Sequence, residues 1–241
     1  MNDAATAALR RVSRHLVPLL FLLYLFSYID RVNIGYAALQ MNKELGFSPA
    51  VFGLGAGLLF LGYVLFGIPS NFVMKKVGSR VWLSLLAIAW GVVAVGNALI
   101  SNEATFYGMR FLLGLAESGF VPGMLLYLTN WYPQSERAKV VSTLYMATAV
   151  SVIVAGPLSG AIMQMDGVAG LSGWKWILIL EGVPPILLGL YALKALPEGP
   201  ADATWLPANE RDQLVAALAE GDAAQADKSY TTFAAALRSF L

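Results

Sequence analysis

The sequence predicts an all-α membrane protein with six transmembrane helices followed by a polar linker. Three observations carry this prediction: 58% of the 241 residues are hydrophobic, only 13% are charged, and the apolar residues gather in long runs. A water-soluble domain of this size needs more polar surface than these residues supply. The fold class therefore follows from composition and from the length of the apolar runs.

The six spans are placed by the thickness of the membrane. A helix that crosses a hydrocarbon core about 30 Å thick needs about 20 apolar residues. Such runs are predicted at residues 16–36, 51–73, 81–100, 105–131, 140–164 and 174–193. The first run is not followed by a small-residue cleavage site, so we interpret it as a retained span and not as a signal peptide.

Lysine and arginine residues predict the orientation. Those on one side of the six spans are Arg10, Arg11, Arg14, Lys75, Lys76, Arg80, Arg137, Lys139 and Lys194, and those on the other side are Lys43 and Lys175. The side richer in these residues is expected to face the cytoplasm. The sequence thus predicts an integral protein of the plasma (inner) membrane with both ends of the chain in the cytoplasm.

Composition changes after the sixth span and divides the chain. We expect a cytoplasmic tail at 1–15, a six-helix domain at 16–196, and a cytoplasmic linker at 197–230 in which "WLPANERDQLVAALAEG" forms a short surface helix ended by Gly221. The apolar segment 231–241 is expected to start a seventh helix. The chain is therefore expected to be a fragment or the first half of something longer.

Charged residues lie within the spans. Asp30, Arg31, Arg110 and Glu117 are in the middle of apolar runs, and Glu181 lies some way into the sixth span. A charged side chain at the bilayer centre costs about 2.5–3.5 kcal/mol even on a lenient scale. These side chains are therefore expected to face one another or water, and not lipid.

Helical rise places Asp30 and Arg110 at the same depth. Asp30 lies about 21 Å from the cytoplasmic edge of its span, and Arg110 about 7.5 Å from the outer edge, in a core about 30 Å thick. Glu117 follows Arg110 by two turns on the same face, and Gly114 is expected to leave space between them. Asp30 and Arg31 point about 100° apart, so one should line a cavity while a neighbouring helix holds the other.

Two interpretations fit these charges. In the first, Asp30 pairs with Arg110 and Arg31 pairs with Glu117, and both pairs only lock two helices together. In the second, the arginines bind a carboxylate substrate while the acids bind and release a proton, as a proton-driven carrier of organic anions requires. Buried ion pairs are poor stabilisers and ionisable groups inside a membrane indicate function, which favours the second interpretation.

Several fragments together resemble a known family. The fragments "SYIDRVNIGYA", "GYVLFGIPSNFVMKKVGSR", "RFLLGLAESGFVPG", "WYPQSERA" and "WLPANERDQL" are similar to the amino-terminal half of a major facilitator superfamily transporter. Within that superfamily they most resemble the anion:cation symporters, which carry organic acids, sugar acids, phthalate or tartrate. The resemblance covers essentially the whole chain and implies six helices that pack against a missing C-terminal six-helix half.

The resemblance also implies roles for individual residues. It implies that Asp30 and Glu117 take part in proton coupling, that Arg31 and Arg110 hold the substrate carboxylate, and that Tyr63 contributes to the binding site. The implied partners are a small organic-acid anion, protons and the lipid bilayer, with no cofactor and no metal. The loop "NFVMKKVGSR" departs from the superfamily pattern, because Asn71 and Lys75 stand where a glycine and an acid are usual, while Gly78 and Arg80 remain.

Other functions are weaker candidates. A net charge of +1 with clustered charges gives no basic face for nucleic acid, and the absence of cysteine excludes disulfides and thiolate metal sites. An intramembrane serine protease would need a base to activate Ser118, and the only histidine, His15, precedes the first span. A haem-binding anchor is disfavoured for the same reason. Sodium-coupled symport, anion exchange and a six-helix module without transport activity stay open.

Overall fold

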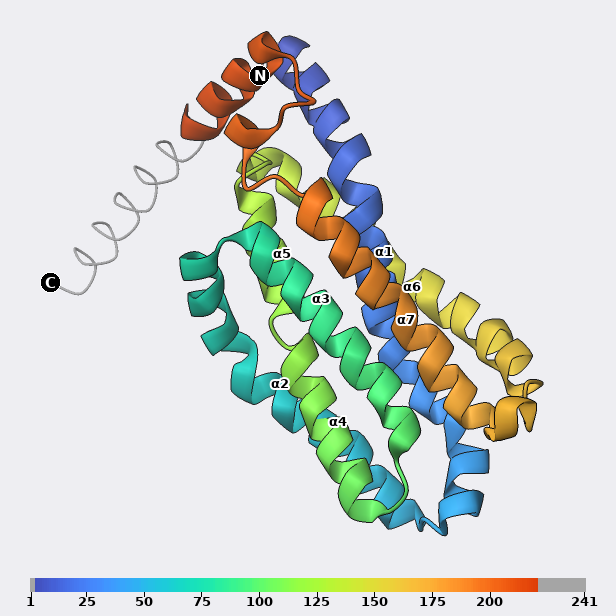
Figure 1. The fold of residues 1–241 in the computed structure, drawn as a ribbon. Coiled ribbons are helices and arrows are strands. Elements are labelled where there is room, and N and C mark those ends of the chain that lie inside the picture. Colours follow the sequence, from blue (N-terminus) through green and yellow to red (C-terminus); the bar gives the residue numbers. More distant parts are fainter. Residues whose placement is uncertain (1–2, 221–241) are drawn as a thin grey trace, which may run out of the picture.

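The computed structural model describes residues 3–220, and its regular structure over these residues is entirely helical (Figure 1). The helices in chain order are α1 (Asp3–Leu45), α2 (Pro49–Val77), α3 (Ser79–Gly96), η1 (Asn97–Leu99), α4 (Glu103–Glu117), α5 (Phe120–Thr129), α6 (Gln134–Met163), η2 (Val168–Gly170), α7 (Gly173–Ala195) and η3 (Pro200–Asp202). A further helical segment covers residues 208–220. Gly221 and the segment 231–241, predicted to end one helix and start another, lie outside the described residues.

Within residues 3–220, six spans are long and apolar enough to cross a membrane, as predicted. The fourth of them, Glu103–Thr129, consists of two helices, α4 and α5, that meet at Ser118 and Gly119. The sequence predicted a single unbroken run there. The Ser70 hydroxyl of α2 occupies the position that a Cβ at residue 119 would fill, so a larger residue at 119 would displace Ser70.

Local signals in the sequence explain where two helices begin. The Ser48 hydroxyl accepts a hydrogen bond from the Val51 amide at 3.2 Å, and Pro49 supplies the first residue of α2. At the start of α4, the Asn102 side chain accepts from the Thr105 amide at 2.9 Å, while the Thr105 hydroxyl accepts from the Asn102 amide at 3.1 Å. This reciprocal capping box satisfies amides that would otherwise lack partners.

The long helices lie side by side in an elongated bundle (Figure 1). Helix α1 packs against α6 and α7, α3 packs against α7 and α4, and α2 packs against α4. Helices α2 and α4 approach closely, because a Cβ at Gly114 would overlap the carbonyl oxygen of Leu59. Such contacts let two backbones meet where lipid provides no hydrophobic drive for helix association.

The segment after α7 packs back on the end of the bundle where α1 starts. Trp205 stacks on His15 with ring centroids 4.2 Å apart, and Arg11 forms an ion pair with Glu210 at 3.0 Å. The Tyr127 hydroxyl donates to the Pro197 carbonyl at 2.7 Å. This segment therefore has fixed contacts with α1 and α5.

Candidate functional site

An ion pair joins α1 to α4 in the middle of the bundle. Arg31 Nε donates to Glu117 Oε2 at 2.8 Å, although 86 residues separate the two in sequence. The Glu117 side chain is fully buried, whereas the Arg31 side chain keeps 21% of its surface exposed. A charge-assisted hydrogen bond of this length is a strong contact, and its arginine is only partly buried.

Tyr63 of α2 joins this pair from the other side. The Arg31 guanidinium carbon lies 4.5 Å from the centroid of the Tyr63 ring, which is cation–π geometry. Tyr63 also lines a cavity of about 630 Å³ that extends between α2 and α5 and includes Ser118 and Lys75. The structure thus brings together three of the residues predicted for the site.

Asp30 and Arg110 are both buried, but they do not form a direct ion pair. Asp30 Oδ1 accepts from Asn33 Nδ2 at 3.4 Å, and its charge lies within electrostatic range of Arg110. Arg110 is 2% exposed, its Nε has no hydrogen-bond partner among the described residues, and Glu117 is also within its electrostatic range. Of the two ion pairs weighed from the sequence, only that of Arg31 with Glu117 is present.

The sequence predicted that Gly114 leaves space between Arg110 and Glu117, and this prediction is wrong. The backbone of Leu59 on α2 fills the position in front of it. All three residues are buried on one face of α4. Helix packing explains this difference. Where glycine has no side chain, the backbone of the neighbouring helix packs into the space, so no cavity forms there.

A further buried acid, Glu181 of α7, was given no role from the sequence. It is 1% exposed, and its Oε1 accepts from the Ser159 hydroxyl of α6 at 2.7 Å. The Asn33 side chain lies beside it, and Asp30 is within electrostatic range. The signal in the sequence was a lone carboxyl in the apolar run "WILILEGVPPILLGL".

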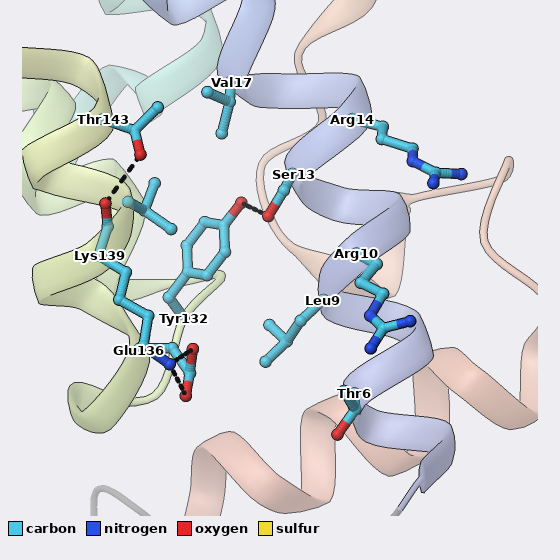
Figure 2. A pocket seen from close by; sticks show the side chains of 11 residues that line it. Thr6, Leu9, Arg10, Ser13, Arg14, Val17, Tyr132, Glu136, Lys139 and Thr143 are labelled. Atoms are coloured by element: carbon cyan, nitrogen blue, oxygen red, sulfur yellow. Dashed lines mark hydrogen bonds and ion pairs between the residues drawn. The ribbon is translucent and has the colours of Figure 1, made fainter. Parts of the chain in front are cut away.

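A second cavity lies away from these charges, between α1 and the start of α6 (Figure 2). It measures about 690 Å³, and Arg10, Arg14 and Lys139 are among its lining residues. Ser13 and Tyr132 bridge its two sides, with 3.0 Å between their hydroxyl oxygens (Figure 2). Burial raises the pKa of Tyr132 to about 12, so this phenol stays neutral at physiological pH.

Comparison with known families decides the assignment of this bundle. Residues 20–240 match the Major Facilitator Superfamily. The chain belongs to this superfamily. The six apolar spans of residues 3–220, with charged residues buried among them, are therefore an integral membrane domain of a Major Facilitator Superfamily protein.

Two bacterial members of the superfamily are similar over nearly the whole chain. A protein of Agrobacterium vitis named as a tartrate transporter is 43% identical over 233 residues, which cover 97% of this chain and 54% of the relative. The metabolite transport protein NicT of Pseudomonas putida is 42% identical over 231 residues, or 95% of this chain and 53% of NicT. The chain thus spans about half the length of these relatives.

A solved superfamily structure has the same fold. The inward-facing, occupied form of a bacterial homolog of the human lysosomal transporter Spinster matches with a TM-score of 0.73 at 23% identity. The match covers 78% of this chain and 45% of that chain. The predicted fold, the N-terminal half of a major facilitator bundle, is confirmed.

The loop that departs from the superfamily pattern has a contact of its own. Gly78 adopts a φ of 96°, and the Glu198 carboxylate lies where a Cβ at residue 78 would point. That carboxylate accepts from the backbone amides of Ser79 at 2.8 Å and Arg80 at 3.1 Å. An acid from the segment after α7 therefore caps α3, at a loop where Lys75 replaces the usual acid.

Proposed function

We propose that this chain is the N-terminal half of a secondary active transporter that carries a small organic anion together with a proton. The observation that supports it most is the buried ion pair of Arg31 with Glu117 beside Tyr63. Ionisable groups inside a membrane domain mark substrate and proton pathways by default. The names of the relatives support the transport of a metabolite, with a carboxylate such as a sugar acid, a dicarboxylate or an aromatic acid as the substrate class.

The proposed coupling uses competition for Arg31. A substrate carboxylate that binds the guanidinium of Arg31 replaces Glu117 as its partner, and Arg110 supplies the second positive charge. Glu117, buried and deprived of its arginine, then takes up a proton, because an uncompensated buried carboxylate is costly. Anion and proton are thereby linked without touching each other. Asp30, within range of Arg110, is the second proton-coupling acid of this proposal.

The whole transporter is proposed to contain a second six-helix half. Facilitator-type carriers place substrate near the bilayer midplane between two halves that rock against each other. The mid-span position of Arg31 and Glu117 fits such a site. We propose that the protein lies in the inner membrane with both ends of this chain in the cytoplasm. The excess of lysine and arginine on that side of the spans supports this orientation.

Uptake by the complete protein in proteoliposomes tests the proposal. A panel of radiolabelled acids that includes tartrate is supplied with an inward proton gradient, with an inward sodium gradient, or with internal anion alone. Accumulation that needs the proton gradient supports the proposal. Accumulation driven by sodium, or exchange without either gradient, would replace proton symport with the corresponding mechanism, and no uptake of any acid would contradict the substrate class.

A further inference from the structure

Glu181 is a buried acid without a positive partner. Its Oε1 accepts from Ser159 at 2.7 Å, whereas Oε2 is buried and has no hydrogen-bond partner among the described residues. The sixth span thus carries a carboxyl group into the interior of the bundle, where water cannot solvate it.

The helices packed against α7 bring no cation to Glu181. The only charged residue of α3 is Arg80, at its start, and the charged residues of α6 all lie in its first two turns, about 30 Å from Ser159 along the helix. The lysines of α7 lie at its ends. Helix α1 brings Asp30 and Arg31 to this depth, and Arg31 is bound to Glu117. The charged group within electrostatic range of Glu181 is therefore another acid, Asp30.

Asn33 connects the two acids. Its Nδ2 donates to Asp30 Oδ1 at 3.4 Å, and the same side chain lies beside Glu181. Three buried acceptor oxygens nevertheless have no hydrogen-bond partner among the described residues: Asp30 Oδ2, Asn33 Oδ1 and Glu181 Oε2. Two buried N–H groups without a partner, Trp90 Nε1 and Arg110 Nε, lie near Asp30 and not near Glu181. Glu181 Oε2 therefore still lacks a donor, and protonation of the carboxyl meets this need because it turns an acceptor into a donor.

Counting charges gives the same result. Three acids are buried in the part of the chain that the structure describes: Asp30, Glu117 and Glu181. Arg31 and Arg110 balance two of them, so a third ionised carboxylate would be uncompensated. An uncompensated buried charge costs several kcal/mol, whereas a protonated carboxyl that is hydrogen-bonded to Ser159 costs far less. Of the three acids, Glu181 is the one with no arginine in range.

We propose that Glu181 is a third proton-binding carboxyl of this site and that it shares one proton with Asp30 across Asn33. Two acids linked in this way titrate as a pair, so the charge state of one sets that of the other. Asp30 in turn lies within range of Arg110 and Glu117, which connects α7 to the ion pair on α1 and α4. The use of this proton in transport rests on the proposed function, whereas its presence on Glu181 does not.

Infrared difference spectroscopy on the complete protein in membranes tests the proposal without a transport assay. A protonated carboxyl has a carbonyl band that an ionised carboxylate lacks. At neutral pH this band should be present, lost in Glu181→Gln, shifted in Ser159→Ala, and unchanged in Glu103→Gln, the same substitution at an exposed acid. A band that survives Glu181→Gln, or that is absent from the unsubstituted protein, would overturn the proposal.

The link between the two acids needs its own variant. Asp30→Asn should move the pH at which the Glu181 band disappears, and an unmoved pH would overturn the sharing of the proton. If Glu181→Gln does not fold, the shift in Ser159→Ala decides the assignment. Proton-driven uptake without a Glu181 band would refute this inference alone, and a Glu181 band without proton-driven uptake would refute the proposed function alone.

Discussion

Arg31 on α1 donates to Glu117 on α4 over 2.8 Å, and the same guanidinium lies on the Tyr63 ring of α2. One side chain therefore connects three helices in the middle of the bundle. The contact with the Tyr63 ring favours a planar, delocalised guanidinium group, which an ammonium group does not have. The first two predictions concern this pair.

Arg31→Lys should weaken substrate binding at least about tenfold in the complete transporter, because a loss of about 1.4 kcal/mol corresponds to that factor. A lysine can neither form two parallel hydrogen bonds with a carboxylate nor stack its flat face on Tyr63. The affinity for a transported acid, measured on purified protein, checks this expectation. Arg80→Lys, the same change at an exposed site, is the control. Equal affinity of the unsubstituted protein for an acid and its amide would make Arg31 a structural residue.

Glu117→Gln should abolish accumulation driven by a pH gradient and preserve exchange of substrate. Glutamine has nearly the shape of the protonated acid but cannot release a proton. Uptake and counterflow in proteoliposomes at several external pH values separate the two activities. If the variant still concentrates substrate in response to external acid, Glu117 is not the coupling group, and Asp30 becomes the leading candidate.

Gly114→Ala should destabilise the protein by about 1–3 kcal/mol, because its methyl group would overlap the Leu59 carbonyl and push α2 away from α4. Gly108→Ala on the same helix meets open space and should be neutral or stabilising by up to about 1 kcal/mol. Thermal unfolding of both variants in one detergent gives the comparison. Equal melting temperatures would mean that the two helices do not approach at Gly114.

Glu198→Ala should cost about 0.5–2 kcal/mol, since the loss of a helix cap has this magnitude. The amides of Ser79 and Arg80 lose their acceptor, so their hydrogen exchange should speed up together with that of the segment after α7. Asp202→Asn in the same segment is exposed and serves as the control. Unchanged exchange at both amides would show that the cap is not formed in solution.

Asp166 should make the loop between α6 and α7 sensitive to acid. The amide of Gly173 and then the side chain of Gln40 donate to its carboxylate, at 2.8 and 2.7 Å, and they lower the pKa of Asp166 below its ordinary value. A lowered pKa in the folded protein adds stability above the unfolded pKa of about 3.9, and that stability is lost as the pH falls through the folded value.

Exchange of the Gly173 amide follows this loss. Protection of this amide is its exchange rate in the denatured chain divided by its rate in the folded protein at the same pH. This ratio should decrease below about pH 4 in the unsubstituted protein. In Asp166→Asn, protection should be weaker at neutral pH and should not change over this interval. A variant with the same acid response as the unsubstituted protein would show that another group controls the loop.

The sequence by itself determined the six spans and which charged residues are buried among them. Both follow from properties of single segments: an apolar run long enough to cross the membrane crosses it, and a charge inside such a run avoids lipid. Asp30, Arg110 and Glu117 could therefore be assigned to the interior without any knowledge of packing. The family resemblance added Tyr63, which the structure places on Arg31.

Only the tertiary structure decided which of these residues meet. Spacing fixes where a side chain points around its own helix, but the rotation and offset of two helices depend on contacts such as Gly114 with Leu59. The helix contacts of the whole bundle bring Arg31 onto Glu117 while Asp30 and Arg110 form no direct ion pair. They also place Glu181 beside Ser159, because a partner on another helix is a property of the assembled bundle and not of either helix alone.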